Sequence, residues 1–116
     1  MEEKLYKVEH DVKRLMETER PLFFGKSAIA FWSYKITSIL EKHYVKYSIY
    51  KEDADRLTVL IGDYLIKIAF TEKGINDNLK EWDITRKGSL RGFVINMLKI
   101  SDSGIIGIYE GIAPLN

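Results

Sequence analysis

The stretch that most constrains this chain runs from Arg56 to Thr71, where two apolar segments flank the dipeptide Gly62-Asp63. Apolar side chains alternate along both segments, and β-branched and aromatic residues dominate, as they do in half-buried strands. Gly62 can adopt a positive φ without steric cost, so a two-residue reversing turn is available. The sequence therefore predicts a β-hairpin, and the rest of the chain is expected to cover or extend it.

The two faces of this hairpin differ in polarity. One face is almost wholly apolar and is predicted to point into the core: Leu57, Val59, Ile61, Tyr64, Ile66, Ile68 and Phe70. The opposite face mixes Thr58, Lys67 and Thr71 with Leu60 and Leu65. Because the mixed face is too apolar to be fully solvated, we expect a helix or a partner chain to cover part of it.

Two amphipathic helices are predicted ahead of the hairpin, over residues 2–19 and 27–43. In each of them apolar residues recur every three or four positions and form one stripe. Pro21 ends the first helix, because the residue before a proline is pushed out of the α region. The period then changes to two, which predicts a strand over 44–50. Residues 44–71 are therefore expected to form a three-stranded antiparallel meander.

The chain after the hairpin carries weaker patterns. Residues 72–88 are polar and irregular, with room for a short helical turn near 77–82. Residues 89–100 are predicted as a third helix, and the alternative is a strand that turns at 101–104 into the last segment. The glycine-punctuated segment 105–112 is predicted as a terminal strand, either added to the sheet or exchanged with a partner.

These patterns predict an α+β fold. We expect an antiparallel three-stranded meander and a C-terminal strand, packed against two N-terminal helices and one later helix. A length of 116 residues suits a single domain over 1–116. The N-terminus is charged, unlike a signal peptide, and no apolar run is long enough to span a bilayer, so we expect a soluble, cytoplasmic protein without membrane partners.

Composition excludes several chemistries. The chain has no cysteine, which rules out disulfides, thiolate metal sites and cysteine nucleophiles. Glutamine is absent while lysine and glutamate are plentiful, a pattern typical of thermophiles. A net charge of +1 does not by itself predict nucleic-acid binding, but it leaves room for a local basic patch.

Motifs for metal, cofactor or catalytic chemistry are missing. His10 and His43 stand in no metal-ligand spacing, and the acidic turn at 52–55 lacks the glycine and terminal glutamate of a calcium loop. A nuclease site built on Asp63 would need an acidic residue at Leu65. There is no glycine-rich phosphate loop and no nucleophile elbow. We therefore predict neither a metal nor a cofactor, and we resolve no catalytic residue.

One stretch has electrostatic character: Arg86, Lys87, Gly88, Ser89 and Arg91. A helix beginning at Ser89 would present free backbone N–H groups to this basic loop, and Gly88 would let a ligand approach the main chain. The sequence therefore predicts a site for an anion or a nucleic-acid phosphate. The alternative is a basic surface loop that pairs with Glu81 or Asp83.

The absence of catalytic motifs and the two-sided apolar strands favour a small non-enzymatic binding, adaptor or regulatory protein, acting through a protein–protein interface as a homodimer. The residues predicted for that interface are apolar or aromatic side chains that the predicted core does not use: Phe23, Phe24, Tyr44, Tyr50, Leu60, Leu65, Ile106 and Ile108. The alternative function is nucleic-acid binding through the basic loop, with Arg86, Lys87 and Arg91 as phosphate contacts.

Overall fold

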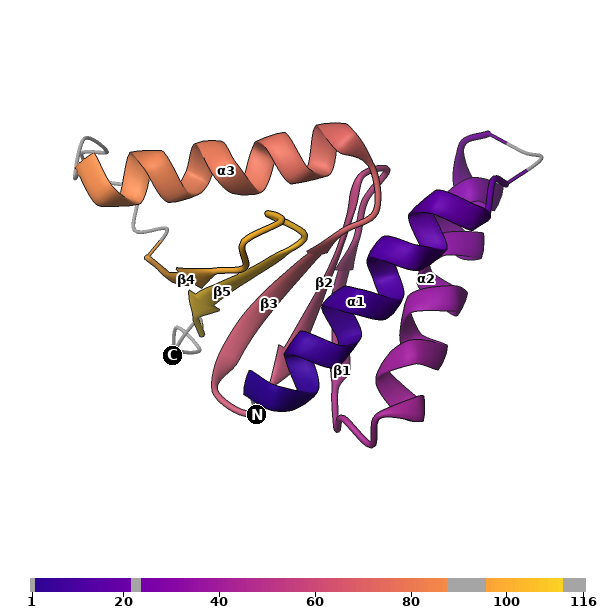
Figure 1. The fold of residues 1–116 in the computed structure, drawn as a ribbon, viewed down its shortest axis with the longest axis horizontal. Coiled ribbons are helices and arrows are strands. Elements are labelled where there is room, and N and C mark those ends of the chain that lie inside the picture. Colours follow the sequence, from indigo (N-terminus) through magenta and orange to yellow (C-terminus); the bar gives the residue numbers. More distant parts are fainter. Residues whose placement is uncertain (1, 22–23, 88–95, 112–116) are drawn as a thin grey trace.

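The computed structural model describes residues 2–21, 24–87 and 96–111. Within these residues it has three helices and five strands (Figure 1). The helices are α1 (Glu2–Thr18), α2 (Lys26–Lys42) and α3 (Glu72–Lys87). The strands are β1 (Ser48–Glu52), β2 (Arg56–Ile61), β3 (Tyr64–Ala69), β4 (Met97–Ile100) and β5 (Ile106–Glu110). The predicted α+β fold is confirmed.

The strands form one antiparallel sheet in the order β1-β2-β3-β5-β4. β2 and β3 are the predicted hairpin, with Ile61 opposite Tyr64 and a positive φ of 61° at Gly62. The terminal strand β5 pairs with β3, and β4 closes the other edge of the sheet. The terminal strand was predicted either to join the chain's own sheet or to be exchanged with a partner. In the structure it joins the chain's own sheet.

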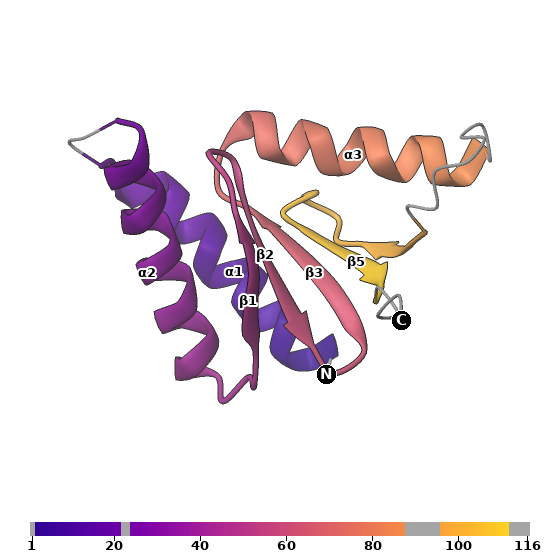
Figure 2. The ribbon, with the colours of Figure 1, turned by 180° about the vertical axis from the view of Figure 1, so that it is seen from behind.

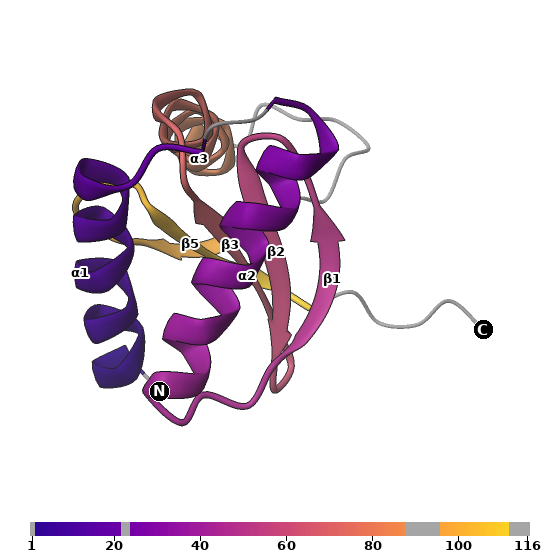
Figure 3. The same ribbon diagram turned by 90° about the vertical axis from the view of Figure 1, so that its right-hand side faces the viewer.

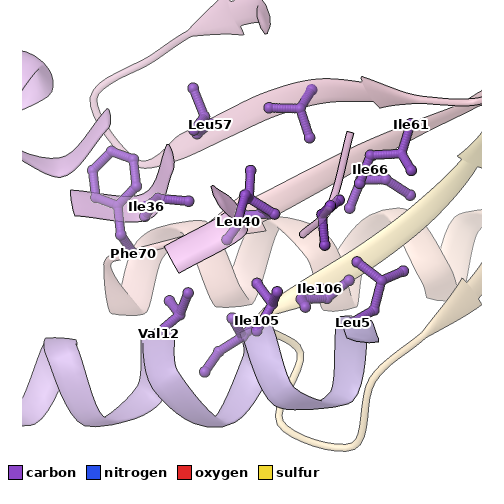
Figure 4. Packing of buried hydrophobic residues seen from close by; sticks show 14 of the residues in the cluster. Leu5, Val12, Ile36, Leu40, Leu57, Ile61, Ile66, Phe70, Ile105 and Ile106 are labelled. Carbon is purple, nitrogen blue, oxygen red and sulfur yellow. The ribbon is translucent and has the colours of Figure 1, made fainter. Parts of the chain in front are cut away.

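The predicted core face of the hairpin packs against α1 and α2, which lie together on one side of the sheet (Figures 1 and 3). This core is mainly apolar, with Ser33 as the buried polar residue of α2, and Ile36 and Leu40 of the same helix are fully buried in it. Figure 4 shows side chains of α1, α2, β2, β3 and β5 converging there. The hydrophobic effect therefore accounts for the attachment of both N-terminal helices.

The mixed face of the sheet is covered by α3, which contacts β3 and β4 (Figure 2). A smaller apolar cluster lies under this helix and consists of Leu65, Met97 and Tyr109, with Leu60, Trp82 and Ile100 packed against it. The cover expected for this face is thus supplied by a helix of the same chain. Because both faces of the sheet carry helices, both faces can be apolar.

The position of the later helix differs from the prediction. Residues 72–87 form a full helix and not an irregular segment with one short turn. The pattern is misleading because the buried residues of α3 are Gly74 and Asn78, so its contact stripe is not apolar. Both ends of α3 nevertheless carry residues typical of helix termini. Thr71 is the N-cap, because its Oγ1 accepts a hydrogen bond from the N–H of Gly74 at 3.0 Å. Basic residues occupy the last turn, where the helix dipole favours them.

The prediction of a helix over 89–100 is wrong for its last four residues, which are strand β4. The alternative prediction, a strand that turns at 101–104 into the terminal strand, is the one the structure confirms there. Gly104 has a φ of 79°, and Ser101 and Ile106 join the two strands through a hydrogen bond of 2.9 Å. Residues 88–95 lie outside the described part of the chain.

The first strand of the meander begins later than predicted, at Ser48 and not at residue 44. Tyr44 has a φ of 58°, and the N–H groups of Tyr44 and Val45 bond the carbonyls of Glu41 and Leu40. This is a Schellman ending of α2, with tyrosine where glycine is usual. The residues predicted as the start of a strand are therefore occupied in closing the helix.

Candidate functional site

A groove runs between α1 and the β4–β5 edge of the sheet. Its volume is about 360 Å³. Its apolar floor includes Leu5 of α1 and Ile106 and Ile108 of β5, two of the residues predicted for an interface. Ile106 is buried in the core, whereas Ile108 is only half-buried. Leu5 of α1 belongs to the same buried cluster as Ile105 and Ile106, whereas Ile108 is only partly buried against that cluster.

The rim of this groove is mainly acidic. Glu3 and Glu9 line it from α1, and Asp102 lines it from the turn after β4, against one cation, Lys99. Ser103 donates a hydrogen bond to Glu9, which ties the turn to the helix. Tyr6 stands on the rim with 73% of its surface exposed. An isoleucine floor under an acidic rim suits an apolar segment that carries positive charge.

The remaining predicted interface residues are scattered. Leu65 is buried and Leu60 half-buried beneath α3, so both already contact their own chain. Phe24 and Tyr44 are highly exposed at opposite ends of α2, and Tyr50 is half-exposed on β1. Phe23 lies outside the described residues. Ile106 and Ile108 of the predicted set line this groove together, and Tyr50 and Leu65 line a second hollow on the other face of the sheet.

The residues of the predicted anion site lie on both sides of the boundary of the described chain. Arg86 and Lys87 form the last turn of α3 and therefore lie at the C-terminus of that helix. Lys87 pairs with Asp83 at 3.0 Å, as the alternative interpretation expected. Gly88, Ser89 and Arg91 fall outside the described residues. Cations at this end of a helix are stabilised by its dipole.

A second polar feature, which the sequence patterns did not reveal, lies under α3. Oε1 of Glu81 accepts hydrogen bonds from Arg56 at 3.0 Å, from Lys67 at 3.2 Å and from the phenol of Tyr109. Arg56 also donates to Asn78 at 2.9 Å. We call these five residues the Glu81 cluster. Its members come from four elements, so only the fold brings them together.

Burial and charge act against each other within the Glu81 cluster. Burial raises the pKa of Glu81, but hydrogen bonds from Arg56 and Tyr109 and the positive charges of Lys67 and Arg56 outweigh it, so the pKa is lowered. Burial and the bond to Glu81 raise the pKa of the Tyr109 phenol, which stays neutral. The Lys67 ammonium also lies 4.5 Å from the centre of the Tyr109 ring, a cation–π contact.

Asn78 completes the cluster by joining α3 to the turn before β5. It is fully buried, and its amide donates to the carbonyl oxygens of Gly104 at 2.9 Å and Ile105 at 3.3 Å. A period-four contact stripe of Gly74, Asn78 and Trp82 is visible in the sequence, but nothing local indicates which strand residues face it. Strand register places Arg56 and Lys67 on one face of the sheet, and the packing of α3 on that face brings Glu81 to both.

Two further properties bear on function. Across residues 2–21, 24–87 and 96–111, no group of three His, Asp or Glu side chains is placed to hold a metal ion. No helix in that part of the chain has the length and apolar character needed to cross a bilayer. Comparison of the chain with protein-family models, with curated proteins and with solved structures finds no significant match.

Proposed function

We propose that this chain is a non-enzymatic protein-binding module, and that the groove between α1 and β4–β5 receives an apolar segment of a partner protein flanked by basic residues. The observation that supports this most is the half-buried Ile108 and its apolar neighbours beneath an acidic rim. Apolar floors supply affinity at protein interfaces, whereas rim charges select and steer the partner.

The partner we favour is a different protein and not a second copy joined edge to edge. Both edge strands are irregular: the register of β1 shifts between Ile49 and Lys51, and that of β4 between Met97 and Lys99. Bulges and lysines on edge strands discourage pairing with another sheet. The predicted homodimer would therefore need another surface, and light scattering at micromolar concentration measures whether it forms.

The test uses two peptide arrays that differ only in charge. In one array short leucine- and isoleucine-containing segments are flanked by lysines, and in the other by glutamates. We expect the chain to bind the lysine array selectively at low salt, and the preference to weaken as salt is added. The variant with both Glu3→Lys and Asp102→Lys should bind the lysine array about tenfold more weakly, because two attractive charges become repulsive.

The matched control carries Glu17→Lys and Glu52→Lys. Both glutamates are exposed, and neither lines the groove. Because each variant replaces two acidic residues by lysine, the control changes the net charge by the same amount as the groove variant. The control should keep the wild-type preference. Equal binding of the two arrays by the wild-type chain, or equal loss in the control and groove variants, would contradict the proposal.

A further inference from the structure

The second hollow lies on the face of the sheet that carries α3, where β1, β2 and β3 run side by side. Its volume is about 250 Å³, which is below the range of drug-sized pockets and suits a small molecule. It shares no lining residue with the groove between α1 and β4–β5. A ligand of this hollow would therefore be independent of the proposed interface.

Thr58 of β2 lines this hollow with a hydroxyl group that has no partner. The residue is only 4% exposed, yet its side chain makes no hydrogen bond within the described part of the chain. Of the side-chain polar atoms there that are fully shielded from solvent, only Ser33 Oγ lacks a partner, so Thr58 Oγ1 is open to the hollow. A ligand that accepts a hydrogen bond from this hydroxyl would satisfy a buried polar group.

Three cations surround this hydroxyl. Strand register pairs Thr58 with Lys51 of β1 on one side and with Lys67 of β3 on the other. Paired residues project from the same face of a sheet, and neighbouring strands lie about 4.8 Å apart. Arg56 projects from the same face two positions earlier on β2. Because all four residues line the hollow, the unpartnered hydroxyl faces a site for an anion.

Carboxylates of the protein neutralise only two of these three positive charges. Lys51 lies 3.8 Å from Asp53. Arg56 and Lys67 share one oxygen of Glu81, at 3.0 Å and 3.2 Å. One positive charge is therefore left without a counter-charge among these partners.

Glu110 is a further acidic residue of the lining, but it reaches the hollow from the other face of the sheet. It pairs with Tyr64, three positions from Lys67 on β3, so the two residues project from opposite faces. Its carboxylate accepts a hydrogen bond from Asn96 at 2.9 Å. Glu110 therefore stands apart from the row of Lys51, Thr58 and Lys67.

The rest of the lining includes apolar and aromatic surface. Leu65 and Tyr109 are both buried, and the half-exposed Tyr50 lines the hollow from the edge strand β1. The phenol of Tyr109 is already bonded to Glu81, so this residue offers its ring to a ligand and not its hydroxyl. The hollow thus combines a site for one anionic group with an apolar surface beside it.

From these observations we propose that the hollow binds a small monocarboxylate with an apolar or aromatic body. The carboxylate accepts a hydrogen bond from the Thr58 hydroxyl and lies between Lys51 and Lys67, and the body rests against Leu65 and Tyr109. One negative charge matches the one positive charge that is left over. A phosphate monoester carries close to two negative charges at neutral pH and would exceed it.

Three probes with the same ring test the proposal by NMR titration of the wild-type chain at neutral pH: benzoate, the neutral isostere benzamide, and phenyl phosphate. We expect benzoate to bind and to shift the amide resonances of Thr58, Leu65 and Lys67. Benzamide should bind about tenfold more weakly, and phenyl phosphate more weakly than benzoate. Absence of benzoate binding, equal binding of benzamide, or tighter binding of phenyl phosphate would overturn the proposal.

Two variants test the hydroxyl and the charge separately. Thr58→Val keeps the shape of the side chain and should weaken benzoate about fivefold. The midpoint of urea unfolding should stay the same or rise, because the hydroxyl has no partner in the free chain; a lower midpoint would contradict this role. Lys51→Met should weaken benzoate about threefold and leave the neutral benzamide unchanged. Equal loss of both probes in Lys51→Met would overturn the assignment of the carboxylate.

Thr37→Val and Lys13→Met are the matched controls. Both residues lie outside the hollow, on α2 and α1, and each control makes the same chemical change as one of the variants. Each should bind the three probes as the wild-type chain does. A control that loses benzoate binding to the same extent as its matched variant would show that the hollow does not determine binding, and would overturn the proposal.

Discussion

The two faces of the sheet hold their helices by different means. Toward α1 and α2 the sheet buries apolar side chains almost exclusively, whereas toward α3 it buries Asn78 and the partly shielded ions of the Glu81 cluster beside a small apolar patch. Apolar packing is non-directional and insensitive to pH, whereas a charged network is directional and loses strength when one member titrates. The comparison teaches that one small sheet can carry both kinds of attachment, and that only the second depends on the charge state of its members.

The largest expected effect is on the apolar face. Leu40→Ala removes a fully buried side chain from the core between α2 and the sheet, and should lower the free energy of unfolding by about 2–5 kcal/mol. Denaturant unfolding followed by circular dichroism measures it. Leu98→Ala, at a residue 45% exposed on β4, is the control and should change stability by less than about 0.5 kcal/mol. Similar losses in the two variants would show that this core is not closely packed.

A smaller effect is expected on the polar face. Glu81→Gln preserves the shape of the side chain and one acceptor oxygen but removes the negative charge that Arg56 and Lys67 share, and should cost roughly 2 kcal/mol. Asp83→Asn breaks the exposed pair with Lys87 on the same helix and should cost less than about 0.5 kcal/mol. A Glu81 variant as stable as the Asp83 variant would mean that the cluster contributes nothing to the attachment of α3.

Gly74 gives an intermediate test, because two effects oppose each other there. Alanine favours a helix over glycine by about 1 kcal/mol, so Gly74→Ala is expected to stabilise an isolated α3. In the folded chain, however, a Cβ at this position would lie 2.3 Å from the carbonyl oxygen of Asp55. We expect the steric conflict to prevail, with a net loss of about 1 kcal/mol in chemical denaturation. A gain in stability would show that α3 can shift away from the β1–β2 turn.

The contrast between the faces also explains what the sequence could and could not predict. The hairpin, both N-terminal helices and the core face follow from apolar periodicity, because hydrophobic burial leaves a regular trace in the sequence. α3 was missed because its contact stripe is built on Gly74 and Asn78. Strand β4 was assigned as part of a helix because both of its faces would be apolar. The alternation of polar and apolar residues that is typical of a half-exposed strand is therefore missing there.

Predicting the candidate sites depends on the same distinction. Ile106 and Ile108 were identified as spare apolar residues, but the groove they line also needs residues of α1 and of the turn after β4. The hydrogen bonds to Glu81 join residues 14 to 28 positions apart, and no local spacing predicts that Arg56, Lys67 and Tyr109 share one carboxylate oxygen. Long-range register therefore determines both sites, and a single sequence does not reveal it.

The smallest expected effect is on the pH dependence of stability at acid pH. The folded chain lowers the pKa of Glu81 below its ordinary value of 4.5, so the folded state takes up this proton less readily than the unfolded state. The stability that Glu81 contributes is therefore fully present above about pH 4.5 and is lost as the pH falls through the lowered folded pKa. Stability measured by urea unfolding across this range should fall less steeply in Glu81→Gln than in the wild-type chain.

Asp11 supplies the matching measurement on the other face. It accepts hydrogen bonds from His43 at 2.7 Å and Lys42 at 3.2 Å; burial opposes these contacts, but they prevail and lower its pKa. In Asp11→Asn the free energy of unfolding should therefore also fall less steeply as the pH is lowered. Because Asp11 joins α1 to α2, amide hydrogen exchange at low pH should change in those two helices and not in α3. If Glu81→Gln and Asp11→Asn changed amide exchange in the same helix, the attachment of α3 would not be independent of the attachment of α1 and α2. Acid would then destabilise the whole sheet and not one face of it.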